Sequence, residues 1–395
     1  MPIITTFIRR CAKAAALIVW LGLLAATPAR ATPLVPASDD EVVEILPAVS
    51  GSRAEERRLR KQLALQPQDP TLAVATAKRY LDQAHELGDP RFAGMAMAAI
   101  QPWQDPATMP PEVLMMRVNL QQYLHEFDAS VASLQQLLAR PSPQPRPQAW
   151  LTLATVRRVQ GRYAESDKAC EQVAANGAAL HANACLAENA GLRGDTDKAR
   201  AIFESLLTSP GLPAGVRAWL TTSLAELEER AGRAAQADAA FRTALKLDPD
   251  PYGMVAYADF LIDQGRSAQA LTLLKDQART DAIVLRLAIA GTLAKAPSAA
   301  ADVAEMRERI DLANERPDAK LFHGREQAMF ALKVDKDAAR ALELARGNAE
   351  HQREPLDLLV LAQSARASGQ PAALKDAQKL TQQMGLVDQR IKALL

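Results

Sequence analysis

Side chains that could act as nucleophiles, bases or metal ligands are few and scattered in this sequence of 395 residues. No serine stands in a Gly-x-Ser-x-Gly turn, the setting that makes a serine nucleophilic. Neither a His-Glu-x-x-His helix nor a Cys-x-x-Cys pair is present to hold zinc, and no Gly-x-x-x-x-Gly-Lys loop is present to bind phosphate. The histidines are spread along the chain, at His85, His125, His181, His323 and His351. We therefore expect no enzymatic activity, no cofactor and no metal.

A group of methionines is the one compositional oddity, comprising Met95, Met97, Met109, Met115 and Met116. Soft thioethers can bind cuprous copper, which makes metal handling an alternative function. Methionine also fills irregular gaps in hydrophobic cores. Met95 and Met97 are two positions apart, and residues with this spacing do not share a helix face. Their spacing therefore favours a role in core packing over a common copper site.

The elements that must position these side chains are predicted by a pattern that returns about every 34 residues. Each unit has an apolar ladder with helical spacing, such as Trp150, Leu153 and Ala154, followed by a glycine and then a small, a bulky and a small residue. Two short amphipathic helices joined at a corner would bury their apolar faces only by stacking on neighbouring pairs. Glycine suits the corner because it adopts the left-handed conformation without strain. The corner glycines recur at intervals of 33, 38 and 33 residues, at Gly161, Gly194, Gly232 and Gly265.

This pattern resembles the tetratricopeptide repeat (TPR) family, most closely over residues 217–250, where the matching positions include Leu224, Ala225, Gly232, Ala237, Phe241, Ala244 and Pro249. The resemblance implies an all-α fold, a right-handed α-solenoid or superhelix of TPR-like helix-turn-helix repeats, over residues 52–395. We expect eight or nine helix pairs, with proline-rich loops at 101–111 and 141–147. The clearest repeats are 111–142, 147–178, 180–211, 218–249, 251–282 and 355–388, and the degenerate ones lie in 53–100 and 283–354.

The first 31 residues have the features of an export signal. They combine a run of 13 apolar residues with a small-x-small cleavage site at 29–31, and a basic end formed by Arg9, Arg10 and Lys13. The apolar run is short for a membrane span, which needs about 20 residues. We predict a Sec-type signal peptide cleaved after Ala31, an extended leader at 32–51, and a periplasmic or secreted product with no stable membrane span. A retained membrane anchor is the alternative.

Signal cleavage would remove four basic and no acidic side chains, so the formal net charge would change from +1 to −3. Nucleic-acid binding depends largely on basic side chains that meet phosphates, so this mildly acidic balance argues against it. Two cysteines, Cys170 and Cys185, would remain in an oxidising compartment. A disulfide there would stabilise the chain by about 3 kcal/mol. The repeat register favours two reduced, partly buried thiols, because Cys170 should lean into the core and Cys185 toward the groove.

In the family that the sequence resembles, the first helix of each pair lines a concave groove that binds partners. Placing the sequence on this helix puts an acidic strip beside two aromatic residues, a surface that would suit a basic or mixed peptide with an apolar anchor. An ordinary solvated helix face is the alternative. The predicted groove residues are Arg158, Glu188, Trp219, Glu226, Glu229, Tyr252, Asp259 and Asp263.

The sequence therefore predicts a non-catalytic protein-protein interaction scaffold in the bacterial envelope. Its partner would be another envelope or secreted protein or peptide, bound in the concave groove. Two alternatives are open: copper handling by the methionine-rich segment, and an accessory subunit of a secretion, pilus or polysaccharide-export machine.

Overall fold

The computed structural model describes residues 51–87, 89, 91–315 and 324–395. The predicted signal peptide at 1–31 lies outside the described residues, as does the leader at 32–51 apart from Gly51, where the first described helix begins. The features discussed below lie in one compact unit of the chain, Glu55–Leu395.

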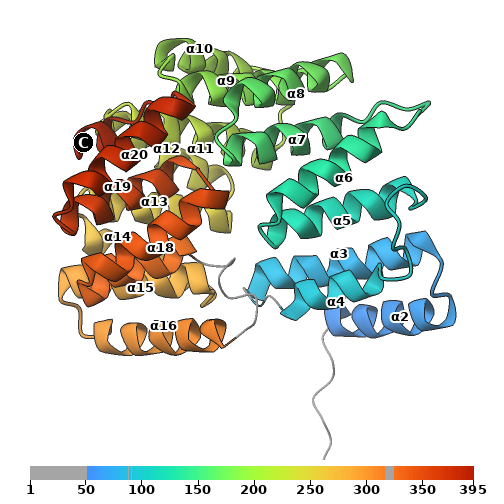
Figure 1. Cartoon of the computed structure of the whole chain (residues 1–395), viewed down its shortest axis with the longest axis horizontal. Helices are drawn as coiled ribbons and strands as arrows, with labels where there is room; N and C mark the ends of the chain where they lie inside the picture. Colours follow the sequence, from blue (N-terminus) through green and yellow to red (C-terminus); the bar gives the residue numbers. More distant parts are fainter. Residues whose placement is uncertain (1–50, 88, 90, 316–323) are drawn as a thin grey trace, which may run out of the picture. The chain divides into compact units, whose positions relative to one another are not determined.

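The described residues form helices and connecting loops, with no strand among them (Figure 1). A π-helical turn, η2, continues α17. The elements are α2 (Gly51–Leu65), α3 (Pro70–Leu87), α4 (Arg91–Ala99), α5 (Pro111–Tyr123), α6 (Phe127–Ala139), α7 (Pro147–Val159), α8 (Tyr163–Ala175), α9 (Ala179–Leu192), α10 (Thr196–Leu207), α11 (Ala214–Arg230), α12 (Ala234–Leu247), α13 (Pro251–Asp263), α14 (Ser267–Leu274), α15 (Asp281–Ala294), α16 (Ala299–Asn314), α17 (Gly324–Phe330), η2 (Ala331–Asp335), α18 (Ala338–His351), α19 (Pro355–Ala367), α20 (Pro371–Met384) and α21 (Gln389–Lys392).

From α3 to α20 the helices pack as nine consecutive pairs, and each second helix except α16 and the last, α20, lies between its own first helix and that of the next pair. First helices also contact one another along the series α7, α9, α11, α13, α15, α17 and α19. They therefore share one face of the stack, and the second helices lie behind them. The fold is the expected all-α class, a right-handed α-solenoid of TPR-like helix pairs.

The predicted corner glycines confirm the register of the repeats. Gly161, Gly194, Gly232 and Gly265 all have positive φ, for example +74° at Gly161 and +77° at Gly232. L-residues with a Cβ rarely adopt this conformation, so glycine ends each first helix where the chain must turn. The two proline-rich segments form the loops between α4 and α5 and between α6 and α7, as expected, except that their last residues, Pro111 and Pro147, begin α5 and α7.

Phe241 shows how one pair fills its core. Its ring is fully buried on α12, between Ala237 and Ala244, and lies 5.4 Å from the ring of Tyr257 and 5.6 Å from that of Phe260, measured between centroids. The small alanines let neighbouring helices approach while the aromatic ring occupies the space between them.

The methionine-rich segment is part of the hydrophobic core of the first pairs. Met109 and Met116 are buried, and Met97 and Met115 pack against the same cluster. Met95 is 47% exposed. Four of the five methionines therefore contribute to hydrophobic packing.

The chain after α20 returns to the corners of much earlier pairs. The Val387 N–H donates to the Leu192 carbonyl oxygen over 2.8 Å. Met384 covers Gly161 so closely that a Cβ there would lie 2.5 Å from its Cε, and Gln389 lies beside Gly232. Figure 1 shows the C-terminal helices in red beside the green and yellow helices of these pairs. We call residues 384–390 the closing segment.

Candidate functional site

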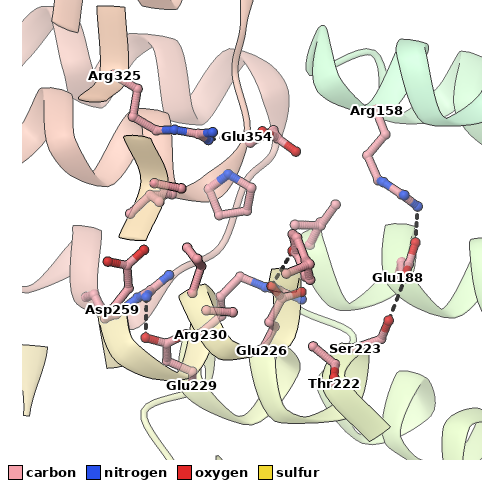
Figure 2. A pocket seen from close by; sticks show the side chains of 18 of the residues that line it. Arg158, Glu188, Thr222, Ser223, Glu226, Glu229, Arg230, Asp259, Arg325 and Glu354 are labelled. Atoms are coloured by element: carbon pink, nitrogen blue, oxygen red, sulfur yellow. Dashed lines mark hydrogen bonds and ion pairs between the residues drawn. The ribbon is translucent and has the colours of Figure 1, made fainter. Parts of the chain in front are cut away.

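A pocket of about 540 Å³ lies on the face shared by the first helices. Its walls come from α7, α9, α11, α13, α15, α17 and α19, with Tyr163 of α8 and Arg390 of α21 completing it. Figure 2 shows side chains from these helices pointing into a common space. The pocket therefore depends on helix pairs that are far apart in the sequence.

Helix α11 contributes most to the wall because its polar side chains recur at helical spacing on one face. Its opposite side buries Leu220 and Leu227 against neighbouring apolar residues. The sequence predicted that the first helix of each pair lines the groove, and the polar face of α11 does line the pocket. The α11 residues that line it are Trp219, Thr222, Ser223, Glu226, Glu229 and Arg230.

The structure brings together seven of the eight predicted groove residues. Asp263 is not part of the pocket lining, and it pairs with Lys333, with 2.9 Å between Oδ1 and Nζ. That these residues bind a partner stays a prediction. The seven that line the pocket are Arg158, Glu188, Trp219, Glu226, Glu229, Tyr252 and Asp259.

The acidic residues of the pocket are mostly paired with cations of the same chain. Arg286 donates two hydrogen bonds to Asp259, over 2.9 and 2.7 Å. Arg390 of the closing segment donates to Glu229 over 2.6 Å. These intramolecular ion pairs largely neutralise the acidic strip, and the basic or mixed peptide that the sequence predicted for it stays a prediction.

Glu188 is held in the same way by two neighbours. Arg158 donates to one of its oxygens, and the Ser223 hydroxyl donates to the other over 2.9 Å. Figure 2 shows this chain of contacts across α7, α9 and α11. Glu188 therefore ties three consecutive pairs together at the pocket wall.

Sequence reasoning missed the opposite wall of the pocket. Arg325 of α17 lies 3.1 Å from Glu354 and 3.4 Å from Asp357, which is fully buried. Arg286 and Arg390 also belong to segments that the repeat pattern assigned no role. The degenerate stretch at 283–354 contains most of α15 and all of α16 to α18, so its weaker pattern hid residues that face the groove.

The two glutamates on α11 have perturbed acidities. Burial raises the pKa of Glu226, although nearby Arg230 and the hydrogen bond that it accepts from the Tyr252 hydroxyl, over 2.5 Å, oppose the shift. Burial raises the pKa of Glu229 to about 7, although Arg390 opposes this shift. Both shifts follow from removing a carboxylate from water.

Glu229 makes a pH-dependent contribution to stability. Between its ordinary pKa of 4.5 and about 7, the unfolded chain ionises this group while the folded chain keeps the proton. Stability therefore falls by up to roughly 1.4 kcal/mol per pH unit in this window because of Glu229. Glu229→Gln removes this term, so the variant should gain stability relative to the parent as the pH rises toward 7. Urea unfolding across this range tests the prediction, and a stability difference that does not change with pH would contradict it.

Apolar and aromatic groups occupy the rest of the lining. The ring of Trp219 stacks on that of His181 with centroids 5.9 Å apart. Tyr252 is 63% exposed, so most of its ring is open to a ligand. Aromatic side chains of this kind often dominate binding energy. The apolar lining consists of Leu192, Val255, Ala256, Ala282, Pro355 and Leu356.

Cys170 and Cys185 are joined by a disulfide in the structure, with their Cα atoms 5.9 Å apart. Both are buried, in a cluster with Ala154 and Ala169. Cys185 thus packs inward from α9 onto α8, whereas the repeat register had placed it toward the groove. The disulfide links α8 to α9 and so joins two successive helix pairs.

Two further searches of the described part of the chain bear on function. None of its helices has the length and apolar character that crossing a membrane requires. Within the same residues, no three His, Cys, Asp or Glu side chains are grouped so that they could hold a metal ion.

No known family model matches the chain, and no curated protein sequence matches it either. Several solved structures are similar in fold. The Rap protein complexed with Competence and Sporulation Factor shares 12% identity at a TM-score of 0.49, covering 87% of this chain and 94% of Rap. The human IFIT1 dimer with PPP-AAAA shares 13% identity at a TM-score of 0.46, covering 84% and 78%.

A tetratricopeptide repeat protein from Parabacteroides merdae shares 14% identity at a TM-score of 0.37, covering 69% of this chain and 98% of that one. At such identities and TM-scores these similarities are no basis for transferring a ligand or a partner to this chain. Its own repeats and pocket define it as a TPR-like α-solenoid.

Proposed function

We propose that this protein is a non-catalytic scaffold that binds an extended segment of a partner protein in the pocket of its first helices. The observation that carries the proposal is the combination, in one pocket, of an exposed aromatic residue, Tyr252, with Trp219 and an apolar floor. Such a lining offers anchor sites for side chains of a peptide.

The ion pairs of the pocket support the same function. They hold the walls in place without a ligand, so that little ordering would be needed on binding. The groups that could act as catalysts, such as Glu188 and Asp259, are engaged with arginines. Copper handling is not favoured, because most methionines of the 95–116 segment are part of the core.

We also propose that the protein works in the periplasm or outside the cell, after cleavage of the predicted signal following Ala31. The disulfide between Cys170 and Cys185 supports this location, since such bonds persist in oxidising compartments. The partner would then be an envelope or secreted protein, including a component of an export machine.

Selection of random peptides displayed on phage, with the full-length protein as bait, tests the binding function. Peptides selected on the unaltered protein should bind Trp219→Ala and Tyr252→Ala at least about tenfold more weakly in fluorescence anisotropy, because each variant loses an aromatic anchor. Leu312→Ala is the matched control, since Leu312 is 58% exposed on α16 and does not line the pocket. The proposal fails if no peptide is selected, or if both pocket variants bind as well as the control.

A further inference from the structure

Three buried polar side chains of the pocket lack the hydrogen bonds that their burial calls for. The Nε of Arg230, the hydroxyl of Thr222 and the hydroxyl of Tyr163 have no hydrogen-bond partner. These residues are only 9%, 3% and 3% exposed. Buried polar groups without partners are rare in native proteins, and a cluster of them in one pocket points to a missing ligand.

Arg230 differs in this respect from the other arginines of the pocket. Arg158, Arg286, Arg325 and Arg390 each form ion pairs with carboxylates. No ion pair or hydrogen bond of the Arg230 guanidinium is found in the described ranges. Glu226, one helical turn earlier on α11, hydrogen-bonds to Tyr252 instead. Among the arginines that line the pocket, Arg230 is the one whose guanidinium makes no direct ion pair with a described carboxylate, although Glu226 is near enough to interact with its charge.

We infer that Arg230 and Tyr163 hold a carboxylate of the bound segment, and that the partner of this pocket is therefore an acidic peptide. This inference rests on the proposed function and names the chemistry of its ligand. The guanidinium offers several N–H donors in a planar fork, and the phenol adds an O–H donor. A set of donors without an acceptor of its own fits an anion.

The surroundings favour a carboxylate over a phosphoryl group. Glu188, Glu226 and Glu354 all lie near enough to act electrostatically on the same part of the pocket. A singly charged carboxylate completes the pairing of Arg230, whereas a doubly charged phosphoryl group would leave extra negative charge beside these glutamates. A basic ligand would face Arg230 directly.

Thr222 indicates that the ligand extends beyond its carboxylate. It lies eight residues before Arg230 on the same helix, which corresponds to about 12 Å along the axis. An extended peptide covers that distance with about four residues. The Thr222 hydroxyl is then placed to bind the main chain of the segment whose carboxylate reaches Arg230.

The experiment uses the same selected peptides and the full-length protein. We expect them to be rich in Asp or Glu, or to depend on a free C-terminal carboxylate. Exchanging the acidic residue for its amide, and amidating the C-terminus, separate the two sources, and one of these changes should weaken binding about tenfold or more. A peptide with phosphoserine in place of the acidic residue should bind more weakly. If it binds more tightly, the site is for phosphoryl groups and the inference is wrong.

Arg230→Met and Tyr163→Phe test the assignment to these residues. Both should weaken the acidic peptide about tenfold and leave its amide counterpart nearly unaffected. Arg230→Met should leave the Tm of the free protein nearly unchanged, because it removes a buried charge that makes no direct ion pair but also removes the attraction of that charge for Glu226. A lower Tm together with an unchanged preference for the acidic peptide would show a purely structural arginine.

The outcomes also separate this inference from the proposed function. Peptides that bind through Trp219 and Tyr252 but show no dependence on a carboxylate would overturn the inference and leave the scaffold function standing. A selection that yields no peptides would overturn both. If Arg230→Met does not fold, the comparison of acidic and amide peptides on the unaltered protein decides the question.

Discussion

Replacing Arg286 by methionine is expected to lower the free energy of unfolding by roughly 3 kcal/mol. Arg286 is 3% exposed and donates two hydrogen bonds to Asp259, so it joins α15 to α13. Removing it leaves a carboxylate that is only 14% exposed without its cation. The open pocket lets water reach this carboxylate, which places the loss at the lower end of the range for broken buried ion pairs.

Urea unfolding followed by circular dichroism measures this loss. The double variant Arg286→Met with Asp259→Asn should recover part of it, because no unpaired charge remains. Arg340→Met is a matched control, since Arg340 is 47% exposed in its pair with Glu343 and such pairs contribute at most about 1 kcal/mol. Equal losses for Arg286→Met and Arg340→Met would mean that the buried pair has no special weight.

Reducing the disulfide between Cys170 and Cys185 is the second change with a large expected effect. Opening a loop of 15 residues should lower stability by about 3 kcal/mol in the chain-entropy description. Because both cysteines are buried, reductant should act mainly once the region opens in denaturant. The urea midpoint of the parent protein should therefore fall when dithiothreitol is present.

The double variant Cys170→Ala with Cys185→Ala serves as the control for reductant effects elsewhere. It should unfold at a lower urea concentration than the oxidised parent and be insensitive to dithiothreitol. Identical unfolding curves for the parent with and without reductant would indicate that the two thiols are free in the purified protein.

The repeat pattern was sufficient to predict the pocket wall formed by α7, α9, α11 and α13. Gly161 and Gly232 fixed the corners, and the 3.6-residue period then placed Trp219, Glu226 and Tyr252 on the groove side. These relationships act within one pair or between neighbours, and helical periodicity records such local relationships directly.

The opposite wall, with Arg286, Arg325 and Arg390, could not be predicted from the same pattern. Arg390 is 161 residues from Glu229 in the sequence, yet the two side chains meet at the pocket. Their meeting depends on small rotations that accumulate over many pairs, and no spacing in the sequence states that sum. Arg230 was missed for a different reason: the register assigned the groove to its neighbour Glu229, and only the structure shows that the arginine is buried without a partner.

The closing segment changes how this solenoid can evolve. An open stack of helix pairs can gain or lose a whole unit by duplication or deletion, because each unit touches only the next. Here Met384, Val387 and Gln389 fit against Gly161, Gly194 and Gly232, three corners in successive units. Inserting one more unit between these regions would displace the closing segment from the three corners. The contacts between the end of the chain and its middle therefore constrain the number of units.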